Sequence, residues 1–408
     1  MEMSISHIRA QFPALETQVY GKPLVYLDNA ASSQRPRSVT ACWKRLAEQE
    51  NANIHRAVHA LAVQATEAFE QSREAVRAFL NAASTEEIVF TSGTTQGINL
   101  LAFSFGEAFV REGDEVIVSV AEHHSNIVPW QMLCERKKAV LKVLDVDENG
   151  GLQADRLEPL ISRRTKIVAI SHISNVLGLV NPVKEIVRIC HAHGVPVLVD
   201  GAQGIVHENV DVQALDCDFY AFSGHKLYAA TGTGVLYGKK KWLDVMPPYM
   251  GGGEMIGHVR FTGTTYAPLP AKFEAGTQNF NAIPTLVPAI DFVRAARADG
   301  AVQAEQAAIL EYIYTQLTQD ERITLYGTPL ESKIPLFSFS VRGAHHEDLA
   351  LILDKMGVAL RSGQMCAEPL MDRLGVTGLL RASFAPYNTL EEAHHFIECL
   401  HKAINMLV

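Results

Sequence analysis

The segment VPVLVDGAQG, residues 195–204, decides the fold of this chain. Its continuous apolar run ends in Asp200 and a glycine-rich turn, which is typical of a parallel strand buried on both faces. The segment CDFYAFSGHK, residues 217–226, repeats this pattern and ends on Lys226. In a doubly wound sheet, ligands bind beyond the carboxyl ends of such strands, so the two segments predict a ligand site at that edge.

Short apolar runs alternate with helical segments from residue 87 onward. The runs are EIVFTS, EVIVSV, TKIVAISH, VPVLVD, CDFYAFS and TGVLYG. Continuous β-branched runs separated by helices predict a mostly parallel sheet with helices on both faces, and therefore the α/β class. The glycine-rich stretch 247–263 predicts a flexible loop. A helical pair at 285–319, further strands and a last helix at 390–407 then predict a smaller α+β unit.

The composition is that of an ordinary globular protein. Of 408 residues, 48% are hydrophobic and 20% are charged, which excludes disorder, collagen and coiled coil as the overall class. The net charge of −9 argues against nucleic acid as a partner, because nucleic acid selects basic surfaces. The sequence has no apolar run of about 18 residues, so we expect no membrane span. Residues 1–15 lack the apolar core of a signal peptide, and we therefore expect a cytoplasmic protein.

The cysteines show no CxxC spacing. There are six of them, namely Cys42, Cys134, Cys190, Cys217, Cys366 and Cys399. This scatter argues against a disulfide framework and against a zinc site, and no metal is predicted. It leaves reduced thiols, of which one can be reactive.

A lysine just beyond a buried strand is difficult to keep solvated. Desolvation lowers the pKa of such an amine, and the neutral form of Lys226 is then a nucleophile for an aldehyde. The alternative interpretation is a surface lysine at a strand end. Asp200 also follows a strand, where a carboxylate can hold the protonated ring nitrogen of pyridoxal 5'-phosphate (PLP). An isolated aspartate at such a position is more often a helix cap or a turn residue.

Two further segments place polar groups at carboxyl ends of predicted strands. SGTTQGIN, residues 92–99, joins a strand to a helix, where Gly93 allows a turn and the helix N-terminus offers N–H groups to a phosphate. It lacks the lysine of a P-loop, and such turns are also common helix caps. His123 follows the strand EVIVSV and could stack on an aromatic cofactor and move protons. For its neighbour His124 a packing or capping role is favoured.

These motifs occur together in one order. GTTQGIN, EHHSNIVPW, SHISNVLG, VLVDGAQ, DFYAFSGHKL and FEAGTQN closely resemble the PLP-dependent cysteine desulfurases of the aminotransferase class V group. RSGQMCAEPLM and VTGLLRASFAPYNT resemble the SufS/CsdA type, or group II. The resemblance implies a homodimer of fold-type I subunits with active sites near the interface. It implies a PLP-binding domain at 23–284 with a mostly parallel seven-stranded sheet, and a small α+β domain at 1–22 and 285–408 that carries the sulfur-accepting cysteine.

The resemblance also implies a role for each matching residue at the cofactor. Lys226 would bond to the PLP aldehyde, Asp200 would hold the ring nitrogen, and Gln203 would hydrogen-bond the ring oxygen. His123 would stack on the ring and serve as a proton donor. Thr277 would reach the phosphate in the neighbouring subunit. The phosphate of the same subunit would be held by Thr94, Thr95, Ser223 and His225.

For the substrate, the resemblance implies L-cysteine, which is converted to L-alanine. Asn175 and Arg381 match positions that grip the substrate carboxylate, for which a guanidinium fork is well shaped. Lys226 would remove the Cα proton, and Cys366 would attack the substrate sulfur and carry it as a persulfide. The sulfur would pass to an acceptor protein similar to SufE, CsdE or SufU for the assembly of iron–sulfur clusters or other sulfur-containing cofactors.

Two other readings compete with the desulfurase. One is another class V enzyme on the same scaffold, such as a selenocysteine lyase or an aminotransferase, and selenocysteine lyase activity is also expected beside desulfuration. The other is a sulfur carrier or scaffold without catalysis, against which Lys226 and Asp200 argue. The sequence departs from its relatives at Ala229–Ala230, where they often carry Gly-Pro, and at Met365, where they often carry histidine.

Overall fold

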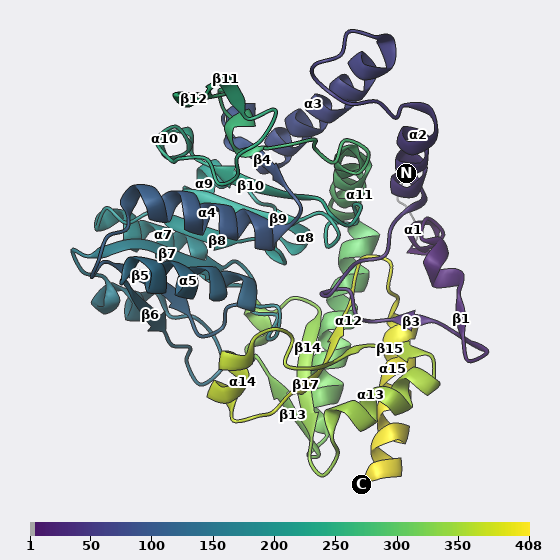
Figure 1. Cartoon of the computed structure of the whole chain (residues 1–408). Coiled ribbons are helices and arrows are strands. Elements are labelled where there is room, and N and C mark those ends of the chain that lie inside the picture. Colours follow the sequence, from purple (N-terminus) through teal and green to yellow (C-terminus); the bar gives the residue numbers. More distant parts are fainter. Residues whose placement is uncertain (1–4) are drawn as a thin grey trace.

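The structure is a computed structural model that describes residues 5–408, so residues 1–4 of the predicted small domain lie outside the described part. Its centre is a seven-stranded sheet in the order β4-β10-β9-β8-β7-β5-β6 (Figure 1). The strands are β4 (Ile88–Thr91), β5 (Glu115–Ser119), β6 (Val140–Leu144), β7 (Thr165–Ser171), β8 (Val197–Asp200), β9 (Phe219–Ser223) and β10 (Gly234–Gly238). β10 runs antiparallel to both neighbours and the other pairs are parallel, which confirms the predicted mostly parallel α/β sheet.

The apolar runs of the sequence predict every strand of this sheet except β6. β6 lies at one edge beside β5, and its residues Val140 and Val143 are exposed. An edge strand is partly solvated, so its sequence VLKVL lacks the continuous apolar run of a central strand.

Apolar layers cover both faces of the sheet. Successive side chains of a strand point to opposite faces. On β5, Val116 and Val118 join the core cluster that includes residues of α4 and α5, whereas Ile117 joins the cluster that includes residues of α3, α7 and α11. The longer helices are α2 (Arg37–Gln49), α3 (Ala60–Leu80), α4 (Thr94–Phe109), α5 (Val128–Lys137), α7 (Val183–Ala192), α11 (Leu286–Ala298), α12 (Gly300–Gln319), α13 (His346–Lys355) and α15 (Leu390–Leu407). The short ones are α1 (Ile5–Arg9), α6 (Ala154–Leu157), α8 (Gly204–His207), α9 (Val212–Leu215), α10 (Lys240–Leu243) and α14 (Glu368–Leu374). Within residues 5–408, no helix is both long and apolar enough to cross a lipid bilayer.

A smaller α+β unit follows the large one and has its own core. Its four-stranded antiparallel sheet has the order β13-β14-β17-β16, and α12, α13 and α15 contribute to the core that covers it. The strands are β13 (Ile323–Tyr326), β14 (Leu336–Val341), β16 (Arg361–Gly363) and β17 (Leu379–Ser383). The predicted helical pair at 285–319 is present as α11 and α12.

The chain crosses between the two units at places that the predicted boundaries do not mark. The strand β3 (Val25–Tyr26) pairs in parallel with β15 (Val358–Ala359), and Val25 belongs to the core of the smaller unit. In the other direction, α11 contributes Leu286 and Ile290 to a core of the large unit. The division at residues 23 and 284 therefore stays a prediction. β3, which it assigns to the large domain, packs on the smaller unit, and α11, which it assigns to the small domain, packs on the large unit.

Part of the stretch predicted as a flexible loop is a β-hairpin. The strands β11 (Ile256–Arg260) and β12 (Gly263–Tyr266) pair antiparallel, and β11 and β12 are exposed along most of their length (Figure 1). A further two-stranded hairpin near the N-terminus joins β1 (Gln18–Val19) and β2 (Lys22–Pro23). Neither hairpin has the apolar face from which a strand is usually predicted.

A buried ion pair completes the edge of the sheet at β4. Arg73 on α3 and Glu274 are almost fully buried, and their side chains form two hydrogen bonds of 2.7 and 2.9 Å. Glu274 Oε1 also accepts from the N–H of Phe90 at 2.7 Å, and Arg73 Nη1 donates to the carbonyl of Ile88 at 2.8 Å. The pair therefore provides β4 with the partners that a further strand would provide, and it leaves this edge covered.

We expect Glu274→Ala to lower the free energy of unfolding by about 3–5 kcal/mol, because it removes the buried carboxylate that faces the Arg73 guanidinium and leaves the N–H of Phe90 without its acceptor. Urea unfolding followed by circular dichroism would measure the change. The matched control is Glu185→Ala, which removes the exposed i,i+3 pair with Arg188 and should leave the free energy of unfolding nearly unchanged, because solvent screens that pair. Equal losses in the two variants would contradict the role given to the buried pair.

Candidate active site

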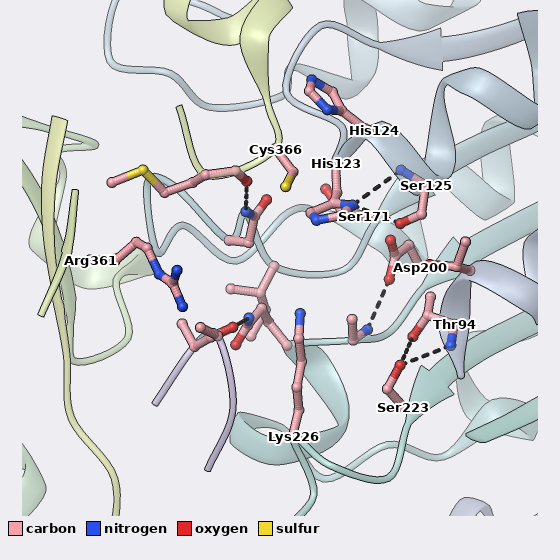
Figure 2. A pocket seen from close by; sticks show the side chains of 18 of the residues that line it. Thr94, His123, His124, Ser125, Ser171, Asp200, Ser223, Lys226, Arg361 and Cys366 are labelled. Atoms are coloured by element: carbon pink, nitrogen blue, oxygen red, sulfur yellow. Dashed lines mark hydrogen bonds between the residues drawn. The ribbon is translucent and has the colours of Figure 1, made fainter. Parts of the chain in front are cut away.

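A cavity of about 560 Å³ opens at the carboxyl edge of the central sheet, between the two units (Figure 2). It brings together nearly all of the residues that the sequence predicts for the site, from both units. These lining residues are Thr94, Thr95, His123, Asn175, Asp200, Gln203, Ser223, His225, Lys226, Cys366 and Arg381. The exception is Thr277, which is exposed and does not line the cavity of its own chain.

Lys226 and Asp200 reach the cavity from neighbouring strands. Asp200 is the last residue of β8, where it pairs with Ala221 of β9, and Lys226 follows the end of β9. Burial lowers the pKa of Lys226 to about 8, although the attraction of Asp200 opposes the shift. Burial raises the pKa of Asp200, against the hydrogen bond of 3.0 Å that its Oδ1 accepts from the N–H of Ala202. Low-dielectric surroundings thus make the lysine a better nucleophile near neutral pH.

Two glycines let the turn before α4 come close to the strands beside it. Gly93 has a φ of +154°, and a Cβ on it would stand 3.1 Å from Ser223 Oγ. A Cβ on Gly234 of β10 would meet the backbone nitrogen of Gly93 at 2.6 Å. The N–H and the hydroxyl of Thr94 each lie 2.8 Å from Ser223 Oγ. The result is a cluster of hydroxyls at the N-terminus of a helix, which is suited to an anion.

His123 is fixed in one tautomer by its own turn. Its Nδ1 accepts a hydrogen bond of 3.1 Å from the N–H of Ser125 and lies 2.7 Å from the hydroxyl of that residue (Figure 2). The neutral ring therefore carries its proton on Nε2. Burial lowers the pKa of His123 to about 4, and the positive charge of Lys226 acts in the same direction. His123 is thus a neutral imidazole with one available proton at physiological pH.

Arg381 has a hydrogen-bond donor that no described residue uses. It lies on β17, is 3% exposed, and donates through Nη1 to the carbonyl of Asn175 at 2.8 Å. Its Nη2 lies 3.3 Å from Asp28, while its Nε is buried and has no partner among the described residues. Burial lowers the pKa of Arg381 to about 10. A buried N–H without a partner is costly, so this position favours an anionic ligand.

Arg361 also lines the cavity, although no motif of the sequence predicts a role for it. Its Nη2 lies 2.7 Å from the Oδ2 of Asp28, so one carboxylate faces both Arg361 and Arg381. The letters RSG before the cysteine element contain Arg361, but its approach to Asp28 depends on contacts between segments 333 residues apart. A spacing along the sequence could not reveal that contact.

Cys366 differs from the other cysteines by its exposure. It lies between β16 and α14, is exposed, and lines the cavity, whereas Cys134, Cys190, Cys217 and Cys399 are buried and Cys42 is half-buried. Burial raises the pKa of each of these other thiols. A buried thiol with a raised pKa is inert, so Cys366 is the candidate for a reactive cysteine.

The chain matches known proteins along most or all of its length. Residues 25–396 match the family model described as Aminotransferase class-V. A probable cysteine desulfurase of Vibrio cholerae is 45% identical over 407 residues, and a cysteine desulfurase of Enterobacter sp. is 46% identical over 409 residues, each with 100% of both chains covered. The crystal structure of the cysteine desulfurase CsdA from Escherichia coli is similar with a TM-score of 0.91 and 38% identity, again with 100% of both chains covered.

The electrostatics of the cavity predict a pH profile for Lys226. In the cofactor-free protein, acylation of Lys226 by acetic anhydride should rise with pH and reach half of its maximal rate near pH 8, because only the neutral amine reacts and its pKa is about 8. Peptide mass spectrometry resolves the site. Lys333 is the matched control, because burial lowers its pKa to about 7 but its Nζ is enclosed and donates to Leu177 and Gly327, so it should react slowly throughout. A half-maximal rate of acylation near pH 10.5 would mean that burial does not lower the pKa of Lys226.

Proposed function

The chain belongs to the aminotransferase class-V family and is a cysteine desulfurase of the SufS/CsdA type, and from this premise we propose that the cavity between its two units is the active site. The enzyme converts L-cysteine to L-alanine and transfers the sulfur. The observation that carries the proposal is that an amine with a lowered pKa, a buried carboxylate and an exposed thiol line one cavity, namely Lys226, Asp200 and Cys366.

The family is PLP-dependent, and the residues of the cavity fit that cofactor. The hydroxyls of Thr94, at the start of α4, and of Ser223, at the end of β9, suit its phosphate. The buried Asp200 suits a protonated ring nitrogen, which would offset the cost of burying a carboxylate. When bound, PLP supplies an aldehyde that bonds to an amine and a ring that takes up an electron pair. Thr95, His123, Gln203, His225 and Lys226 would complete the cofactor site.

The substrate carboxylate would bind at Arg381. The buried Nε of this guanidinium lacks a partner among the described residues, and an incoming carboxylate oxygen would satisfy it. Asn175 lies beside it, because Arg381 donates to the Asn175 carbonyl. A guanidinium binds a carboxylate through two parallel hydrogen bonds, which are stronger and more directional than the contact that the ammonium group of a lysine makes with it. This difference explains an arginine at this position.

Proton transfer falls to Lys226 and His123. The Nζ of Lys226 is available as a base because its pKa of about 8 lies close to neutral pH, and it would take the proton from the substrate Cα. His123 stays neutral, because its pKa is about 4, and would donate the proton on its Nε2. At neutral pH His123 is therefore an uncharged acid, and Lys226 acts as the base in the fraction of molecules whose amine is neutral, a fraction that the lowered pKa enlarges.

The sulfur would move to Cys366. A new bond forms between Cys366 Sγ and the substrate sulfur while the bond between that sulfur and Cβ breaks, which leaves a persulfide on the enzyme and, after protonation of the carbon, L-alanine. Atoms balance, because the thiols of Cys366 and of L-cysteine bring two hydrogens, of which one stays on the persulfide and the other goes to the methyl carbon of L-alanine. The exposure of Cys366 lets a second thiol reach the persulfide.

The same proposal extends to partners and assembly. An acceptor protein similar to SufE, CsdE or SufU would take the sulfur for iron–sulfur clusters or other sulfur-containing cofactors. The enzyme would act in the cytoplasm as a homodimer, in which Thr277 of one subunit reaches the phosphate site of the other. The exposure of Thr277 and its position outside the cavity of its own chain support that arrangement.

Cys366→Ala should abolish alanine formation from L-cysteine and leave PLP bound, because Lys226 and Asp200 hold the cofactor without the thiol. Selenocysteine lyase activity should survive, since selenide is the better leaving group and can depart without attack by a thiol. Alanine-dehydrogenase-coupled detection of alanine and direct detection of selenide measure the two activities. In the wild-type enzyme, mass spectrometry after incubation with L-cysteine should find one added sulfur on Cys366.

If Cys366→Ala desulfurated L-cysteine at the wild-type rate, the role given to Cys366 would be refuted. The matched control is Cys42→Ala, which should keep full activity.

Asp200→Asn should weaken PLP retention and slow alanine formation by at least about tenfold, because an amide cannot stabilise a protonated ring nitrogen by charge. Dialysis followed by absorbance of the released cofactor measures retention, and unfolding in urea checks that the fold is intact. Normal retention together with normal turnover would mean that the cofactor lies elsewhere.

A further inference from the structure

The segment that carries Cys366 is held by groups of the large unit. Asn175 Nδ2 donates to the carbonyl of Met365 at 2.9 Å. The N–H of His124 donates to the carbonyl of Cys366 at 2.7 Å, and His124 Nε2 accepts from the N–H of Glu368 at 3.1 Å. In Figure 2 the His124 ring lies near the segment that carries Cys366, on the opposite side of the cavity from Lys226. One residue thus contacts the backbone on both sides of Ala367.

The hydrogen bond that His124 accepts from Glu368 caps the N-terminus of α14. The first N–H groups of a helix have no partner within it, and a side-chain acceptor at the N-cap position usually binds one of them. The N-cap residue of α14 is Ala367, which has no such side chain, and Pro369 has no N–H. The acceptor for Glu368 comes instead from His124, which lies 244 positions earlier in the sequence.

The backbone around Cys366 needs such external contacts. Met365 has a φ of +51° and Cys366 a φ of +55°, so two consecutive residues with side chains lie in the left-handed region. This conformation is strained for any residue other than glycine, and it persists where surrounding contacts enforce it. The bonds from Asn175 and His124 act on the carbonyls of these two residues.

From these contacts we propose that His124 is a positioning residue for sulfur transfer: its imidazole caps α14 and thereby holds the Cys366 segment over the cavity. The capping bond requires that Nε2 lacks a proton, so the neutral ring carries its proton on Nδ1, the opposite of His123. The adjacent histidines both line the cavity but have separate tasks, because His123 faces its interior whereas His124 holds the segment that carries Cys366. The consequence for turnover rests on the proposed function, whereas the contact itself does not.

The first test is amide hydrogen exchange of the PLP-loaded enzyme, measured by mass spectrometry on peptides that cover residues 364–374. In His124→Ala, exchange there should rise roughly fivefold or more, the change expected from the loss of one capping bond. His124→Gln should restore wild-type exchange, because its Oε1 can accept at the place of Nε2. His193→Ala is the matched control, since the side chain of that exposed histidine pairs with Glu158 and does not line the cavity. Unchanged exchange in His124→Ala would overturn the proposal.

The second test separates positioning from cofactor and substrate binding. His124→Ala should lower kcat for L-cysteine roughly five- to tenfold, because the thiol is less often in place, while PLP absorbance and the Kd of L-alanine stay at wild-type values. His124→Gln should recover most of kcat. A loss confined to PLP binding or to alanine affinity would overturn the proposal, as would a glutamine variant that remains as slow as alanine. An inactive wild type would refute the proposed function, while hydrogen exchange would still decide the role of His124.

Discussion

The removal of Lys226 and Asp200 from water is the constraint on which the site depends. An amine and a carboxylate that were free in solvent would be charged at neutral pH, and burial pushes each toward its neutral form. The packing of the central sheet offsets the free energy that this burial costs. Its strands β8 and β9 are buried along their whole length, up to and including their last residues. Functional groups at strand ends thus obtain their pKa values from the rigid core behind them.

Burial alone does not make a lysine reactive, and Lys333 shows the difference. Burial lowers the pKa of Lys333 to about 7, further than that of Lys226. Its Nζ, however, donates to the carbonyls of Leu177 and Gly327, 2.5 and 2.8 Å away, and so holds the two units together. Lys226 lines an open cavity instead. Access to a ligand distinguishes the nucleophile from the structural amine.

The cavity is complete only where the two units meet. The N-terminal segment passes between them, and Asn29 Nδ2 donates to the carbonyl of Ser383 at 2.6 Å while Ala30 accepts from Gln203 at 2.8 Å. Asp28 in the same segment faces Arg361 and Arg381 of the smaller unit. The large unit therefore contributes Lys226, Asp200 and His124 to the lining of the cavity, and the smaller unit contributes Arg361, Arg381 and Cys366. Any shift between the units would change the distance between Cys366 and Lys226 across the cavity.

The sequence by itself determined the order of the buried strands and the chemistry at their ends, because continuous apolar runs and the residues after them are local features. Asp200, Lys226, His123 and Cys366 could be identified in this way together with the family resemblance. The edge strand β6, the placement of β3 and the role of Arg361 could not, since each depends on pairing between distant segments. The pKa values and the capping contact of His124 likewise follow from burial and packing, which only the tertiary structure decides.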